Sequence, residues 1–142
     1  MSSRVRILEP TGFDPALYAL FSELTGEHSD HWALRGGVMI RRYQKLHGRS
    51  PTFRELFDEL MQLPGLVDLA SRARFPDIDK PVAFSFMHHV AVHWRRERWV
   101  IWDSTPRSIR VGSRFAEESR RWRQERGAPR ALGEKGGRSV NT

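Results

Sequence analysis

The stretch SFMHHVAVHWRRERWVIWDSTPRSIRV, residues 85–111, joins an apolar helical repeat to a run of arginines and then to two β-rich segments. On a helix over residues 84–98, a set of apolar side chains shares one side, as in any amphipathic helix. They are Phe86, Met87, Val90, Ala91 and Trp94. Residues 99–102 (WVIW) and 108–111 (SIRV) have strand composition, and turn residues lie between them. We therefore predict a helix that leads directly into a two-stranded hairpin.

Capping residues predict two helices near the N-terminus. Asp14 is followed by a proline, which is typical of a helix start, and Gly26 is a natural end for that helix. Asp30 is the candidate N-cap of the next helix, and Gly48 suits its C-terminal end. The glycine pair 36–37 inside this second helix predicts either a kink or a close helix crossing.

A capping box marks the helix that follows. Thr52 and Glu55 have the T-x-x-E spacing, and the apolar residues after them recur at helical intervals. Residues 66–74 predict a short helix, and 114–126 predict a last helix after the candidate cap Ser113. The sequence therefore predicts a mainly α protein that ends in a hairpin and one more helix.

Charge is the strongest global property of the chain. Its 24 Lys and Arg against 17 Asp and Glu give a net charge of +7, which predicts attraction to polyanions. Segments 35–57 and 82–126 are each net +5, whereas 58–81 between them is net −2. Most of the basic residues are arginine. Recognition of phosphate would explain this bias, and GC-rich coding would explain it equally well.

Several classes of protein are disfavoured. The chain has no cysteine, so disulfides and Cys-ligated zinc are excluded. It has no apolar run long enough to span a membrane, and the segment MSSRVRILEP lacks the apolar core of a signal peptide. We therefore expect a cytoplasmic, nucleoid-associated protein that makes no membrane contact.

Histidines raise the possibility of a metal site. His89 and His93 are four residues apart, so two imidazoles on one helix could share an ion. The zinc-protease motif needs a glutamate directly after the first histidine, and this chain has Val90 there. The loop pair Asp77 and Asp79 would bind a cation only weakly. With no nucleophile or phosphate-binding motif present, we predict no enzyme activity, no cofactor, no metal and no small-molecule ligand.

The segments HGRSPTFRELFDEL (47–60) and RRERWVIWDSTPRSIRV (95–111) together resemble the DNA-binding domain of LexA-type repressors and related bacterial winged-helix regulators. The resemblance covers residues 31–112. It implies a winged helix-turn-helix in which a capped second helix precedes a recognition helix that runs into an aromatic-rich wing. Residues 62–83 depart from this pattern. Either they are an insertion, which we favour, or 66–74 is the recognition helix.

The resemblance implies a DNA-binding surface with three parts. Major-groove contacts would come from the polar side of helix 84–98: Ser85, His88, His89, Val92, Arg95 and Arg96. Phosphate contacts would come from the start of the capped helix: Arg49, Ser50, Thr52 and Arg54. Further backbone contacts would come from the wing: Arg107 and Arg110. A solvated helix face and an exposed hairpin would show the same composition without binding DNA. For Trp99 and Trp102 on the first wing strand, we predict a place in the core in preference to stacking on DNA bases.

The predicted organisation follows from these segments. Residues 1–29 form an N-terminal arm and helix, with VRIL (5–8) as a strand or arm, and 30–112 form the winged helix-turn-helix domain. Residues 113–126 form a C-terminal helix, and 127–142 a disordered basic tail. We expect a homodimer, with helices in 14–47 or 113–126 at the interface, because paired half-sites add affinity.

The expected function is that of a sequence-specific regulator of transcription, most simply a repressor, that binds double-stranded DNA. The alternatives are an architectural or accessory DNA-binding protein in recombination, replication or segregation, and a winged-helix module that binds an acidic protein.

Overall fold

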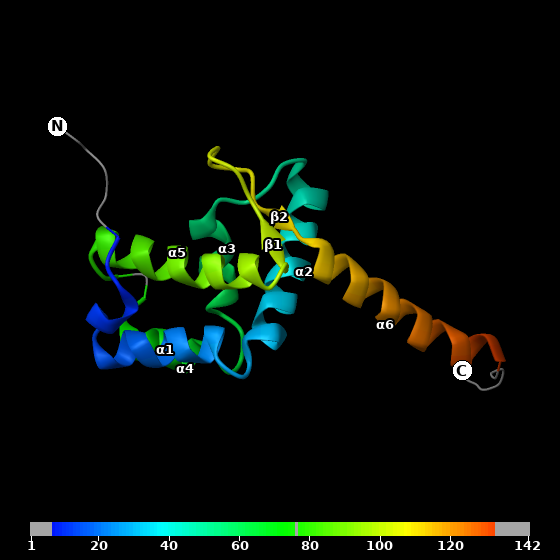
Figure 1. The fold of residues 1–142 in the computed structure, drawn as a ribbon, viewed down its shortest axis with the longest axis horizontal. Helices are drawn as coiled ribbons and strands as arrows, with labels where there is room; N and C mark the ends of the chain where they lie inside the picture. Colours follow the sequence, from blue (N-terminus) through cyan, green and yellow to red (C-terminus); the bar gives the residue numbers. More distant parts are fainter. Residues whose placement is uncertain (1–6, 76, 133–142) are drawn as a thin grey trace.

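The computed structural model describes residues 7–75 and 77–132, with side chains up to residue 124. This part of the chain is a mainly helical domain of six α-helices with one two-stranded antiparallel hairpin (Figure 1). The helices are α1 (Pro15–Thr25), α2 (Ser29–His47), α3 (Phe53–Leu60), α4 (Val67–Ala73), α5 (Lys80–Arg96) and α6 (Ser113–Leu132). The hairpin strands are β1 (Val100–Ile101) and β2 (Arg110–Val111), and a 3₁₀ turn, η1 (Pro10–Gly12), precedes α1.

The predicted helix starts are confirmed at α1 and α3. The Asp14 carboxylate accepts a 2.9 Å hydrogen bond from the Leu17 amide. At α3, the Glu55 amide donates to the Thr52 hydroxyl at 3.1 Å, and the Thr52 amide donates to the Glu55 carboxylate at 2.9 Å. This reciprocal pairing satisfies two amides that the helix itself leaves free.

The prediction that Asp30 caps α2 is wrong, because α2 already begins at Ser29. Asp30 lies in the first turn, and its carboxylate accepts from Trp99 Nε1 at 3.1 Å and from Arg114 at 2.8 Å. It therefore joins α2 to the hairpin and to α6. At the other end, Gly48 has the left-handed backbone (φ 69°) expected of a glycine that ends a helix.

The glycine pair in α2 marks two close helix crossings. A Cβ on Gly36 would lie 3.2 Å from the ring of Trp94 in α5, and one on Gly37 would overlap the ring of Phe115 in α6. The helix is continuous through both residues. Of the two predicted explanations, the close crossing is therefore the one that the structure supports.

Helix α5 lies at the centre of the fold (Figure 1). Trp94 is almost fully buried, stacks on Phe57 of α3 with 6.0 Å between ring centroids, and donates from Nε1 to the Leu24 carbonyl at 3.0 Å. Helices α1 and α4 pack together on one side of α5, and the hairpin rises from its end on the other side (Figure 1). The core predicted from the wheel is confirmed, since all five of its apolar residues are buried.

The ends of several elements differ from the prediction. α5 begins at Lys80, four residues before the predicted start, and the strands are shorter than predicted. β1 pairs with β2 in the register Val100↔Val111. The helix α6 continues to Leu132, beyond its predicted end at 126 and into the predicted tail, while 133–142 lie outside the described residues. The predicted strand or arm 5–8 lies partly outside them, and residues 7 and 8 are in no strand.

None of the helices in the described ranges is long and apolar enough to cross a membrane.

Candidate nucleic-acid interface

One side of α5 is covered by the chain segment before α1. Ser85 is fully buried, and its hydroxyl accepts a 2.9 Å hydrogen bond from the Leu8 amide while donating to the Pro81 carbonyl at 2.8 Å. His89 Nε2 lies 2.8 Å from the Leu8 carbonyl, which can only accept, so this nitrogen carries the proton. The prediction that Ser85 lies on the exposed side of the helix is therefore wrong, and one ring nitrogen of His89 is already engaged by Leu8.

The exposed edge of α5 lies beside that covered side. Phe84 is 41% exposed and stacks on His88, with 6.0 Å between centroids. Val92 is half-buried, and Arg95 is exposed at the end of the same edge. Because these residues recur every three or four positions, they form one stripe along the helix. Arg96 is also exposed, next to the stripe.

The hairpin and α3 extend this stripe. The Arg95 guanidinium lies over the Trp102 ring, 4.7 Å from its centroid, and the same ring meets Phe53 edge-on at 5.2 Å. Trp102 of the hairpin is half-buried and supports Arg95, and Phe53 of α3 in turn supports the Trp102 ring. Packing thus fixes the arginine at the junction of three elements.

A depression of about 510 Å³ connects α3 to the other end of the stripe. Arg54 of α3 and Lys80 and Phe84 of α5 line it together with Asp77, over a floor that includes Met87. Arg54 is exposed and also pairs with Asp58 at 3.1 Å. We call this continuous surface the α5 face; it comprises Arg54, Lys80, Phe84, His88, Val92, Arg95, Arg96 and Trp102.

Arg107 has a different role from the one predicted for the wing. Its guanidinium forms a two-pronged pair with the Glu55 carboxylate at 2.9 and 3.1 Å and also donates to the Ser50 carbonyl and the Tyr43 hydroxyl. The Arg107 hydrogen bond, aided by the Thr52 amide, lowers the pKa of Glu55 to about 2. The same pairing raises the pKa of Arg107. Arg107 therefore fastens the hairpin to the start of α3, and Glu55 neutralises its charge.

Other predicted phosphate ligands divide between exposed and structural positions. Arg49 is exposed, with its guanidinium 5.9 Å from the centre of the Tyr43 ring. Ser50 accepts from Gln44 at 3.0 Å, and Thr52 caps α3. Arg110 is exposed on β2 and donates only to the Ser108 carbonyl, at 3.3 Å, among the described contacts. Arg49 and Arg110 thus keep charge available to solvent.

Comparison with protein-family models, with curated proteins and with solved structures finds no match to this chain. The candidate interface therefore rests on its own geometry.

The helical histidines point to separate partners. His93 Nε2 lies 3.3 Å from the Ser29 hydroxyl of α2, whereas His89 faces Leu8. Within 7–75 and 77–124, no three His, Cys, Asp or Glu side chains form a group that could hold a metal ion. His88 has a lowered pKa, first because it is partly buried and second because His89 is close. Its imidazole is therefore neutral at pH 7 and offers one donor and one acceptor.

Lys80, Phe84 and Trp102 belong to the α5 face but were not predicted as site residues. The sequence contains a signal that places Lys80 and Phe84 on this helix, because Asp79 followed by Pro81 marks a helix start at Lys80. Trp102 was assigned to the core, and its half-burial makes that assignment partly right. Its second use, as a support for Arg95, depends on the angle at which the hairpin leaves α5.

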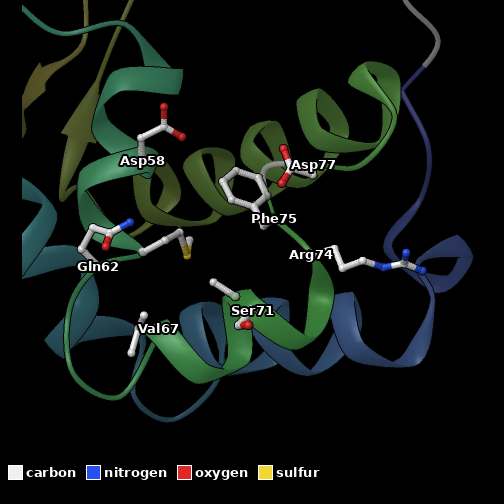
Figure 2. Close-up of a pocket in the computed structure, with 9 residues that line it drawn as sticks. Asp58, Gln62, Val67, Ser71, Arg74, Phe75 and Asp77 are labelled. Atoms are coloured by element: carbon white, nitrogen blue, oxygen red, sulfur yellow. The ribbon is translucent and has the colours of Figure 1, made fainter.

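A second depression, of about 430 Å³, lies between α3, α4 and the segment after α4 (Figure 2). Asp58, Gln62, Ser71 and Asp77 ring an apolar interior that includes Phe75. Asp58 and Asp77 outnumber the one cation in this lining, Arg74, so the depression suits phosphate less well than the one on the α5 face, where Arg54 and Lys80 outnumber Asp77.

Proposed function

We propose that this protein binds double-stranded DNA through the α5 face, with α2, α3, α5 and the hairpin acting as a winged helix-turn-helix. The observation that carries the proposal is the meeting of three elements on one surface. The exposed edge of α5, the start of α3 and the base of the hairpin together present Arg54, Lys80, Arg95 and Arg96. A helix flanked by cations on both sides is the arrangement that enters a major groove while its neighbours hold phosphates.

The packing of α4 favours α5 as the recognition helix. α4 packs against α1, and its buried residues are Ala70 and Ala73. α5 instead runs into β1 with only three residues between them. In our proposal, the segment between α3 and α5, residues 61–79, is therefore an insertion between the second and third helices, and α4 serves to complete the core.

Individual side chains then have distinct roles. Arg96 would donate two hydrogen bonds to a guanine edge, and His88, being neutral, would bond a base or phosphate. Val92 would meet a thymine methyl group. Arg54 at the start of α3 and Arg110 on the wing would hold phosphates on either side.

The simplest biological consequence is regulation of transcription by occupying a site, most directly as a repressor. An architectural role in recombination, replication or segregation would use the same surface. A homodimer would place two α5 faces on neighbouring half-sites, about 34–36 Å apart for one turn of the duplex.

Salt-dependent binding tests the proposal. We compare the wild type with the double variant Lys80→Gln/Arg96→Gln in titrations of a labelled duplex at several salt concentrations. The matched control is Arg42→Gln/Arg121→Gln, which removes two charges that already pair with Glu59 and Glu118. Each lost phosphate contact lowers the slope of log K against log salt by about 0.9. We expect the loss of Lys80 to reduce the slope by about 0.9, and the loss of Arg96 to remove a base contact, so that the face variant alone binds at least about tenfold more weakly.

Equal losses in both double variants would mean that net charge, and not the α5 face, holds the duplex. No duplex binding at low salt would remove the proposal entirely.

One observation favours a second candidate, a module that binds an acidic protein. The depression beside Phe84 has an apolar floor formed by Ile78, Ala83 and Met87, and this could seat an apolar anchor from a partner. Phe84→Ala separates the two functions. It would abolish binding to such a partner while leaving the salt dependence of duplex binding unchanged.

A further inference from the structure

A groove between α2 and α6 is a second candidate site, separate from the α5 face. It exists because Gly37 has no side chain, so the Phe115 ring of α6 packs directly onto the backbone of α2. Phe115 is 5% exposed, which shows how closely the two helices meet there. Beyond this contact α6 projects away from the rest of the fold, as Figure 1 shows. The groove therefore opens where the two helices separate.

Three arginines line this groove. The Arg41 guanidinium lies over the Phe115 ring, 5.7 Å from its centroid, which holds this charge at the groove wall. Arg120 and Arg123 come from α6, three residues apart and hence on the same side of the helix. The groove measures about 410 Å³, and its remaining lining is Val38, Phe115, Ala116 and Ser119. No described acidic side chain contributes to the lining.

Neighbouring arginines contrast with these three. Arg42 pairs with Glu59, Arg98 with Glu117, Arg114 with Asp30 and Glu97, and Arg121 with Glu118, all at 3.6 Å or less. The carboxylates near α6 are thus used by arginines outside the groove. Within 7–75 and 77–124, no carboxylate lies within ion-pair distance of Arg41, Arg120 or Arg123. Their mutual repulsion would be relieved by a bound anion.

We infer that this groove binds the phosphate backbone of double-stranded DNA as a second contact of the protein. Guanidinium forks match phosphate oxygens in pairs, and the Ser119 hydroxyl adds a neutral donor. The apolar side chains of Val38 and Ala116 in the lining suit the sugar edge of a strand. Since phosphates carry no sequence information, the groove adds affinity and fixes orientation, while the α5 face reads bases.

The inference rests on the proposed function only in that both require duplex DNA. Its test uses the full chain and the double variant Arg120→Gln/Arg123→Gln. The control Arg42→Gln/Arg121→Gln removes the same charge at paired positions on α2 and α6, the two helices that form the groove. Thermal unfolding of each variant confirms that it folds. We expect the groove variant to bind a labelled duplex at least about fivefold more weakly, with a salt slope reduced by up to about 1.8.

The outcomes separate the two claims. Loss in the groove variant and in the α5-face variant supports both sites. If only the α5-face variant binds the duplex more weakly, the groove inference is overturned and the proposed function stands. If only the groove variant binds more weakly, the groove inference stands and DNA binding through the α5 face is overturned. If neither binds less tightly than the control, both fail. A parallel titration with poly-glutamate completes the test. If the groove variant loses binding to poly-glutamate but keeps binding to the duplex, the occupant of the groove is an acidic polypeptide, and the inference is overturned.

Discussion

Glu55 is the residue that fastens the hairpin to the start of α3, beside the candidate interface. Its carboxylate caps the backbone of α3 at Thr52 and pairs with Arg107 of the hairpin. The sequence predicted the first role, because a capping box depends on local spacing alone. The second role joins residues 52 positions apart and depends on the path of the hairpin, which spacing does not specify. That is why Arg107 was predicted as a DNA ligand.

Removing Arg107 should loosen the hairpin. The Arg107–Glu55 pair is about one-third exposed on both sides, so solvent screening limits its contribution. We expect Arg107→Ala to lower the free energy of unfolding by clearly more than the loss of a single-contact surface pair does, because this pair is two-pronged and Arg107 also binds Ser50 and Tyr43. Urea denaturation measures this. Arg110→Ala, which removes the other hairpin arginine, should change stability by less than about 0.5 kcal/mol.

The same pair predicts a pH dependence. Glu55 has a pKa of about 2 in the folded protein, below its ordinary value of 4.5. Because the folded state lowers this pKa, the contribution is fully present above pH 4.5 and is lost as the pH falls towards 2. Glu55→Gln should therefore lose less stability than the wild type over this interval in urea denaturation. Parallel curves for the two proteins would contradict the role given to Glu55.

At the scale of elements, the sequence predicted helix α5, but it predicted the wrong residues on the exposed side of that helix. The helical wheel places Ser85 and His89 opposite the apolar side, and polar residues at such positions predict exposure to solvent. Leu8 satisfies both through its backbone, and a bond across 77 residues leaves no periodic signal. The apolar side was predictable because burial of large side chains repeats with the helical period. The polar side was not, since a polar residue is compatible with solvent or with a buried partner.

The α2–α6 contact should be sensitive to any side chain at position 37. Gly37→Val would place its side chain in the space of the Phe115 ring, and we expect a loss of about 1–3 kcal/mol in unfolding free energy. Arg35→Val, at an exposed position in the same helix, controls for the lower helix propensity of valine. Thermal or urea unfolding compares the two. Equal effects would mean that the close approach of α6 contributes nothing to stability.

At the scale of the whole molecule, the order of elements was predictable, whereas their contacts were not. Caps, glycines and periodicity fixed six helices and a hairpin in sequence. The packing of α4 on α1, and the projection of α6, depend on which apolar surfaces meet. Charge behaves in the same way. A net charge of +7 is visible in the sequence, but only pairing distances show which arginines remain without a carboxylate.

The absence of cysteine allows one direct test of the central claim, because a single introduced thiol can carry a photocrosslinker without competition. Phe84→Cys places it on the α5 face, and Tyr18→Cys places it on α1, on the side of α5 away from the hairpin. The two positions are similarly exposed, at 41% and 45%. Crosslinking to duplex DNA should be strong at position 84 and near background at position 18. Equal yields at the two positions, or a higher yield at position 18, would contradict DNA binding through the α5 face.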